Sequence, residues 1–369
     1  MTAVVAQGIP VTMPHAVRSS QPDTMPSDHV LAALAESAKL PTGLCATVAR
    51  SVATHPLRIM IVDNSGSMQT ADGKRFVEQG GVMRSVSCSR WNELTEDVLA
   101  IASISTVLGA RTDVHLLNPT RGFAACSVNA KSWDGIAPLG PAVDESTLGC
   151  QMREIRPNGG TPLTEAVMDV VSMITPIAHS LRANGQAVSV LLCTDGLPNN
   201  RQTFIQAMQQ LQALPVWCVV RLCTDDDAVV DFWNDLDRAL EAPLEVLDDV
   251  RGEAAEVTSL NPWLTYGPPL HMARLFGLPE KIFDAIDEES LLPPQIKEFM
   301  CTLLGVPELP EPEIDLNGFV SAVQQALLTQ PRVIDPRSGK LQPWVDLRAL
   351  ERALRSKKCA SNANGCALM

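Results

Sequence analysis

Short, uninterrupted apolar segments alternate with amphipathic segments over residues 55–260. Uninterrupted apolar segments of this length are typical of strands buried on both faces, and apolar positions repeated at helical spacing favour helices. The strand candidates are 57–62, 113–117, 122–128, 187–193, 216–222 and 244–247. The helix candidates are 89–109, with Ser89 as N-cap, 162–183, 203–214 and 226–240. The alternation predicts a doubly wound α/β domain, in which helices flank a mostly parallel sheet.

The regions outside this block show a different pattern. Residues 1–54 are expected to form a flexible N-terminal segment, within which 28–53 could form one or two short helices. Residues 261–358 form the predicted C-terminal helical region, and residues 359–369 a flexible tail. Helices are expected there at 280–304, 315–329 and 345–357, separated by proline-rich joints.

The composition favours a globular protein that does not bind nucleic acid. Apolar residues make up 46% of the chain, and the formal net charge is −13. Recognition of phosphates needs a basic surface, so this charge argues against a nucleic-acid partner. The charge is uneven: residues 225–316 hold 22 Asp and Glu against 5 Lys and Arg, whereas residues 332–358 hold 8 Lys and Arg against 3 Asp and Glu.

Two predicted strands are followed by aspartates, Asp63 and Asp195. Ligands of open α/β sheets bind beyond the carboxyl ends of the strands, and neighbouring parallel strands would bring these acids together. Two close carboxylates repel, which raises a pKa or requires a cation. Ser65 and Ser67 follow Asp63 closely, with Gly66 between them allowing a tight turn. These oxygen donors suit Mg²⁺, Mn²⁺ or Ca²⁺, and the lack of His and Cys disfavours zinc.

Three sequence segments resemble the metal-ion-dependent adhesion site of von Willebrand factor A-type domains, which have a Rossmann-like fold. Asp63-Asn64-Ser65-Gly66-Ser67 resembles the D-x-S-x-S motif, Asn158-Gly159-Gly160-Thr161 the separate threonine loop, and Thr194-Asp195-Gly196 the distal aspartate. The order of the segments and their strand–loop–helix contexts agree with that family. The resemblance covers about residues 55–260.

The resemblance implies a set of metal ligands and a role for the metal. Ser65, Ser67 and Thr161 would bind the ion through their hydroxyls, and Asp63 and Asp195 would bind it directly or through water. One coordination position would stay open for an Asp or Glu of a protein partner. The resemblance therefore implies a protein-binding module without catalytic residues. Two alternatives stay open: a metal-assisted hydrolase, which would lack a recognisable base, and a metal-free scaffold.

One departure from the family is an insertion of about twenty residues between the D-x-S-x-S motif and the following helix. The insertion, Gln69 to Cys88, contains Gly80-Gly81 and the charged residues Asp72, Lys74 and Arg75. We expect a surface loop beside the metal that covers the site or shapes the choice of partner.

The last four residues, Cys366-Ala367-Leu368-Met369, fit a C-a-a-X prenylation motif. Met at the final position favours a farnesyl group on Cys366, and Cys359 is a possible palmitoylation site. A single lipid binds membranes weakly, so the basic residues upstream would provide a second signal. The motif predicts a peripheral protein on the cytosolic face of a membrane in a eukaryotic cell.

Overall fold

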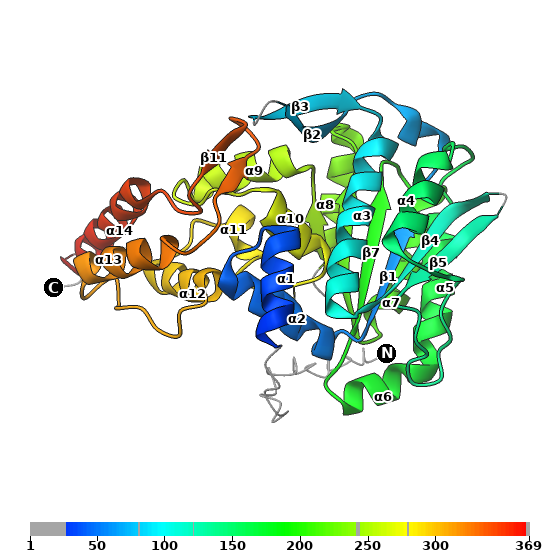
Figure 1. Ribbon diagram of the computed structural model, residues 1–369, viewed down its shortest axis with the longest axis horizontal. Helices are drawn as coiled ribbons and strands as arrows, with labels where there is room; N and C mark the ends of the chain where they lie inside the picture. Colours follow the sequence, from blue (N-terminus) through cyan, green and yellow to red (C-terminus); the bar gives the residue numbers. More distant parts are fainter. Residues whose placement is uncertain (1–26, 80–81, 121, 241–243, 279, 367–369) are drawn as a thin grey trace, which may run out of the picture.

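A seven-stranded sheet lies at the centre of the described part of the chain (Figure 1). The computed structural model describes residues 27–366 except 80–81, 121, 241–243 and 279. The strand order is β6-β5-β4-β1-β7-β8-β9, and all neighbours are parallel except β4 and β5. The bounds are β1 Leu57–Val62, β4 Arg111–Thr120, β5 Phe123–Val128, β6 Ala142–Val143, β7 Val188–Thr194, β8 Val216–Leu222 and β9 Leu244–Leu247. The predicted mostly parallel α/β sheet is confirmed.

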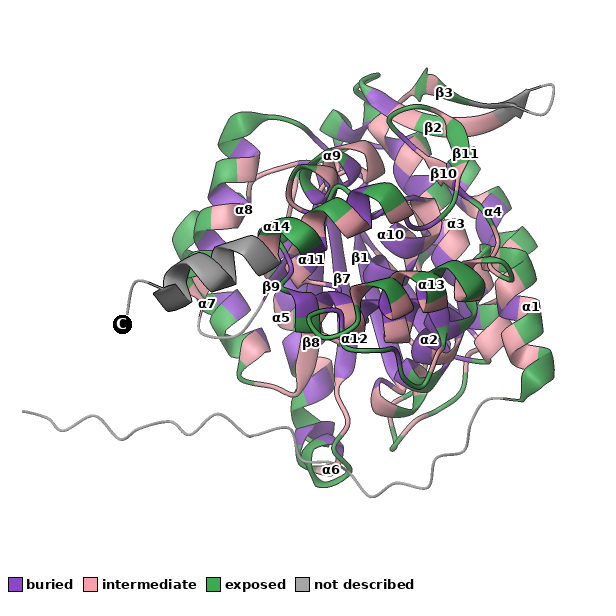
Figure 2. Cartoon of the chain, turned by 90° about the vertical axis from the view of Figure 1, so that its left-hand side faces the viewer, coloured by how far each residue is buried: buried purple, intermediate pink, exposed green. Residues whose placement is uncertain are grey.

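Helices cover both faces of this sheet, because side chains alternate in direction along each buried strand. In β1, Ile59 and Ile61 join one apolar core, whereas Met60 and Val62 join the other. The first core also contains residues of α5 Leu163–Ile174, α6 Ala178–Ala183, α7 Arg201–Gln212 and α8 Asp227–Ala239, with η2 Thr175–Ile177 between α5 and α6. The second contains residues of α3 Arg90–Leu108 and α4 Glu145–Glu154. The central strands β1 and β7 are thus buried between two helical layers, as Figure 2 shows.

Residues 28–54 form two packed helices rather than part of a flexible segment. They are α1 Asp28–Ala38 and α2 Thr42–Thr54, which bury Leu34, Leu44 and Val48 completely. Gly43 in α2 lies against the backbone of Thr302 and Gly305 at the end of α12. The one or two short helices expected over 28–53 are therefore present, and apolar side chains fix them to the protein, so the flexibility expected for 1–54 does not extend to 28–54. Residues 1–26 lie outside the described residues.

The C-terminal region is mainly helical, as predicted, but it shares an apolar core with the sheet. Phe299, Phe319 and Leu350 belong to the same buried cluster as Met60 and Val62 of β1. This region follows α9 Val250–Leu260, and its elements are α10 Pro268–Leu275, α11 Ala285–Glu288, α12 Pro293–Leu304, α13 Leu316–Leu327, β10 Val333–Asp335, β11 Lys340–Gln342 and α14 Leu347–Cys366. The hairpin of β10 and β11 was not predicted.

Two predicted loops have regular structure. The insertion forms η1 Gly66–Gln69 and an antiparallel hairpin of β2 Gly73–Gln79 and β3 Val82–Cys88, which extends beyond the sheet in Figure 1. The helix α14 continues to Cys366, so the backbone of 359–366, which was expected to form a tail, is helical. Among the described residues, no helix combines the length and apolarity needed to cross a membrane.

Candidate metal centre

The carboxyl ends of β1 and β7 lie side by side at the centre of the sheet. Val62 pairs with Cys193 in parallel register, and the backbone N–H of Asp63 donates to the carbonyl of Cys193 at 2.9 Å. This register places Asp63 and Asp195 immediately beyond two neighbouring strand ends. Burial is nearly complete, with 0% of Asp63 and 4% of Asp195 exposed to solvent. The predicted convergence of the two acids at one edge of the sheet is therefore present.

Asp63 is held by donors that favour its ionised form. Its Oδ1 accepts a hydrogen bond from the backbone N–H of Ser65 at 2.8 Å, and its Oδ2 accepts from the hydroxyl of Thr194 at 2.7 Å. Burial nevertheless raises the pKa of Asp63 above its usual range, and the nearby carboxylate of Asp195 acts in the same direction. A cation beside Asp63 would oppose both effects.

The two serines connect Asp63 to Asp195 through the backbone N–H of Ser65 and the two hydroxyl groups. Ser65 Oγ lies 3.1 Å from Ser67 Oγ, and Ser67 Oγ donates to Asp195 Oδ1 at 2.8 Å. Ser65 is buried, whereas Ser67 and Gly66 are exposed. The hydroxyls and carboxylates therefore form one connected polar group that reaches solvent at the turn.

The threonine loop lies against both other segments. The carbonyl of Gly159 accepts from the backbone N–H of Gly66 at 3.2 Å, and a Cβ placed on Gly196 would lie 3.5 Å from Thr161 Oγ1. Gly159 has φ +88°, and a Cβ there would overlap the side chain of Asn118. Glycine at 159 thus allows the loop to approach closely. All five predicted residues, Asp63, Ser65, Ser67, Thr161 and Asp195, belong to these adjoining segments.

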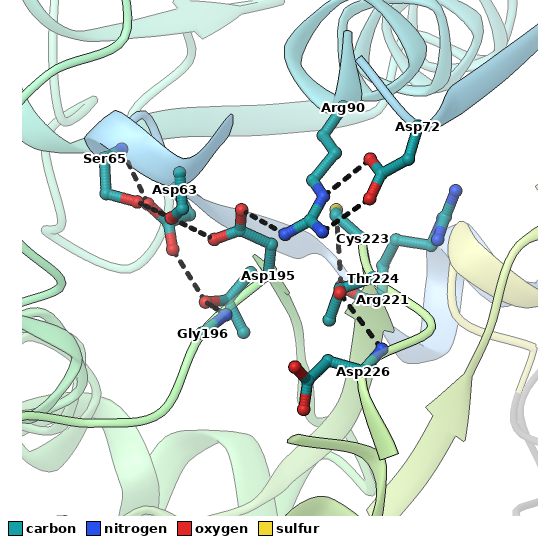
Figure 3. Close-up of polar contacts among 12 residues, drawn as sticks. Asp63, Ser65, Asp72, Arg90, Asp195, Gly196, Arg221, Cys223, Thr224 and Asp226 are labelled. Carbon is teal, nitrogen blue, oxygen red and sulfur yellow. Dashed lines mark hydrogen bonds and ion pairs between the residues drawn. The ribbon is translucent and has the colours of Figure 1, made fainter. Parts of the chain in front are cut away.

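Arg90 and Asp72 complete the arrangement and were not predicted as site residues (Figure 3). Arg90 Nη1 donates to Asp195 Oδ2 at 2.9 Å, while its Nε and Nη2 donate to the two oxygens of Asp72 at 2.8 and 2.6 Å. The hydrogen bond from Arg90 lowers the pKa of Asp72. The sequence offered only a weak signal that Arg90 belongs to the site. Arg90 follows the predicted N-cap Ser89, and an arginine in the first turn of a helix is usually solvated.

The donor set fits a hard divalent cation. It comprises two carboxylates and three hydroxyls, and each carboxylate oxygen has two lone pairs, so the existing hydrogen bonds leave capacity for a metal. The guanidinium of Arg90 supplies one positive charge to Asp195 in the structure as it stands. The geometry is therefore compatible both with a bound metal ion and with charge compensation by the protein itself.

A second acidic group could also hold a metal ion. Ligand oxygens of Glu253, Glu256 and Asp287 all lie within 4.8 Å of one another. Arg274, which is 1% exposed, donates to Glu253 at 2.9 Å and to Asp287 at 3.0 Å. It also donates to Glu245 at 2.7 Å. The arginine already provides a counter-charge here, and sequence reasoning missed this group because its acids come from α9 and α11 and their arginine from α10.

A cavity of about 620 Å³ is lined by none of the residues of the two acidic groups. It is lined by residues of the C-terminal region, including Leu264, Leu328, Trp344 and Arg348. Its volume is in the range of small-molecule sites, but the predicted metal ligands do not line it. The candidate metal centre lies at the carboxyl ends of β1 and β7 and meets solvent at the exposed Ser67.

No protein-family model matches the sequence, and the search of curated proteins found no match. The resemblance to A-type domains therefore depends on the three segments and on their arrangement in the structure. The second predicted site, at the C-terminus, is described only in part. The backbone of Cys359 and of Cys366 belongs to α14, whereas Ala367, Leu368 and Met369 lie outside the described residues.

Proposed function

We propose that this chain contains a von Willebrand factor A-type domain that binds a divalent metal ion and, through it, an acidic side chain of a protein partner. One observation carries the proposal. Segments 63–67, 158–161 and 194–196 are far apart in the sequence but adjoin at one edge of the sheet, where they gather two buried carboxylates and three hydroxyls.

The residues have distinct roles in this proposal. Ser65, Ser67 and Thr161 would hold the ion through their hydroxyls, and Asp63 and Asp195 would hold it directly or through water. When bound, Mg²⁺, or alternatively Mn²⁺ or Ca²⁺, supplies an electrophilic position for an outside carboxylate. Only two carboxylates of the chain would face the ion, so it would keep a strong attraction for a third.

A thermal-shift titration with Mg²⁺ and Mn²⁺ tests the metal site. A ligand at 100 times its Kd stabilises the folded state by about 2.7 kcal/mol, which raises Tm by about 3–4 °C in a protein of this size. Ser67→Ala should abolish most of this rise, because the exposed Ser67 hydroxyl is a proposed ligand. Ser172→Ala, which removes an exposed hydroxyl on α5, is the matched control. An identical rise in both variants would reject the site.

Affinity capture tests the binding role. The full chain is immobilised and incubated with cell lysate in Mg²⁺, and then washed with EDTA. Proteins that elute with EDTA and are not captured by Ser67→Ala support metal-dependent binding of a partner. Retention of every captured protein in EDTA would contradict it.

A metal-free scaffold is the second candidate, and the ion pair of Arg90 and Asp195 favours it. The side chain of Asp195 is 0% exposed, and its charge is already balanced by a guanidinium at 2.9 Å. In this case Mg²⁺ and Mn²⁺ would leave Tm unchanged, and captured partners would be indifferent to chelation.

We also propose that a farnesyl group on Cys366, with possible palmitoylation of Cys359, tethers the chain to a cytosolic membrane face. Prenylation would require the end of α14 to unwind, and Ser361, Asn362, Asn364 and Gly365 have low helix propensity. Intact-mass analysis of the protein from a eukaryotic host tests this proposal. Cys366→Ser should remove the lipid mass and release the protein from the membrane fraction; an unmodified wild-type mass would reject it.

A further inference from the structure

Arg90 is fixed beside the candidate metal centre by both its backbone and its side chain. Its N–H donates to the carbonyl of Thr70 at 3.0 Å, which closes the base of the β2–β3 hairpin. Ser89 caps the helix by accepting from the N–H of Asn92. The bidentate pair with Asp72 then orients the guanidinium so that the remaining nitrogen, Nη1, faces Asp195. Arg90 therefore does not reach Asp195 as a freely rotating surface side chain.

The contact occupies a group that the metal would need. Nη1 donates to Oδ2 of Asp195, while Oδ1 of the same carboxylate accepts from Ser67. The side chains of Asp195 and Arg90 are 0% and 14% exposed, so solvent screens this charge pair less than a surface pair. A divalent cation held by Ser67 and Asp195 would meet the positive charge of Arg90 at short range.

We propose that Arg90 is an internal cation that competes with the divalent metal for Asp195. This inference rests on the proposed metal site. Metal binding displaces Nη1 from Oδ2, and Arg90 keeps its two hydrogen bonds to Asp72 when it does so. Asp72, at 51% side-chain exposure, lies at the solvent side of the pair and provides a place for the displaced guanidinium. In the metal-free protein Arg90 thus balances the charge of the buried Asp195, and this ion pair lowers the affinity of the site for the metal.

The competition has a measurable consequence for affinity and stability. Repulsion between a dication and a guanidinium in a partly buried site is large enough to change affinity by at least about tenfold. Arg90→Gln should therefore bind Mn²⁺ at least about tenfold more tightly than the wild type. The same variant should have a lower Tm without metal, because Asp195 loses its counter-charge. Saturating Mn²⁺ should recover this loss.

Mn²⁺ binding to the full-length protein, followed by electron paramagnetic resonance of the free ion, tests the proposal with the metal alone. Arg90→Lys keeps the positive charge and should bind Mn²⁺ close to the wild-type affinity. Arg84→Gln removes an exposed arginine from the same hairpin and is the matched control for net charge. It should leave the affinity within about twofold of the wild type, since exposed charges are screened.

The outcomes separate this inference from the proposed function. Tighter binding by Arg90→Gln than by Arg84→Gln supports the competition, even where the wild type binds too weakly to measure. If Arg90→Gln and Arg84→Gln bind Mn²⁺ equally and the wild type binds measurably, the competition is overturned and the metal site stays in place. Weaker Mn²⁺ binding by Arg90→Gln than by the wild type has the same meaning. Absence of binding in all four proteins overturns both. In the double variant Arg90→Gln/Asp195→Asn, the tight binding should be lost; its persistence would place the metal elsewhere and reject the inference.

Discussion

The side chain of Asn64 forms a reciprocal pair of hydrogen bonds with the backbone of Asn118. Asn64 Nδ2 donates to the carbonyl of Asn118 at 2.7 Å, and Asn64 Oδ1 accepts from its N–H at 2.8 Å. Asn64 is completely buried, and its own carbonyl accepts from the N–H of Asn158. The side chain of Asn64 thus joins the end of β1 to β4, and its backbone carbonyl holds the threonine loop.

Replacing Asn64 by Ala should destabilise the protein and weaken the candidate metal site. Both backbone groups of Asn118 would lose their partners, and each buried unpaired group costs about 1–3 kcal/mol. We expect chemical denaturation to show a loss in this range and the thermal response to Mn²⁺ to shrink. Asn158→Ala, which removes an exposed amide from the same region, should change neither quantity measurably. Equal effects of the two variants would contradict the role of the Asn64 side chain.

Arg221 makes a buried ion-pair group whose loss should be costly. The arginine is 2% exposed and donates to Glu93 at 2.6 Å and to Asp97 at 3.1 Å, joining β8 to α3. Arg221→Met leaves both acids without their counter-charge, so the free energy of unfolding should fall by about 3–5 kcal/mol. Arg238→Met breaks an exposed pair with Asp235 and should cost at most about 1 kcal/mol. Urea denaturation of the two variants gives the comparison; similar losses would refute the difference.

The Arg274 group should make stability depend on pH near neutrality. Burial raises the pKa of Glu245 to about 7 and that of Glu253 from 4.5 to about 8, although Arg274 opposes both shifts. Between these unfolded and folded values the folded protein holds more protons than the unfolded chain. The contribution of Glu253 to stability is therefore full below pH 4.5 and is lost as the pH rises through about 8.

Glu253→Gln tests this pH dependence, because glutamine resembles the protonated acid. The variant should match the wild type near pH 5 and become relatively more stable as the pH rises to 8. Denaturation curves across this range measure the difference. Glu36→Gln, at an exposed glutamate of α1, should show no such trend. A constant difference between Glu253→Gln and the wild type would mean that Glu253 stays ionised throughout.

Gly43 allows the close contact between α2 and α12. A Cβ at this position would overlap the backbone of Thr302 and of Gly305, neither of which can rotate away. Gly43→Ala should therefore force the helices apart and cost about 1–3 kcal/mol, the usual range for overpacking. Gly160→Ala places its Cβ in open space and should be nearly neutral by thermal denaturation in EDTA. A neutral effect at Gly43 would show that the helices adjust freely.

The sequence was informative wherever local pattern decides the outcome. The strands 216–222 and 244–247 and the N-cap Ser89 agree with the structure residue by residue, because apolar runs and capping residues act locally. The three segments of the candidate site could also be found, since each follows or precedes a recognisable element. Their adjacency followed from the parallel arrangement of β1 and β7.

What could not be predicted depends on contacts between distant parts of the chain. The pairing of Asn64 with Asn118 requires the register of β1 against β4, which the pattern does not define. Arg90 and Arg221 are ordinary charged residues until the fold places them beside buried acids. The insertion was interpreted as a loop because it contains Gly80-Gly81 and the charged residues Asp72, Lys74 and Arg75.

The apolar core shared by the sheet and the C-terminal helices limits how the protein can be divided. A chain ended at residue 260 would lose Leu270, Phe276 and their neighbours, which share this core with Met60, Val62 and Leu191. Such a fragment would aggregate rather than behave as an isolated module. Heating the whole protein should instead give one cooperative calorimetric transition. The C-terminal helical region, in which no motif was recognised, would then be needed to keep the candidate metal centre folded.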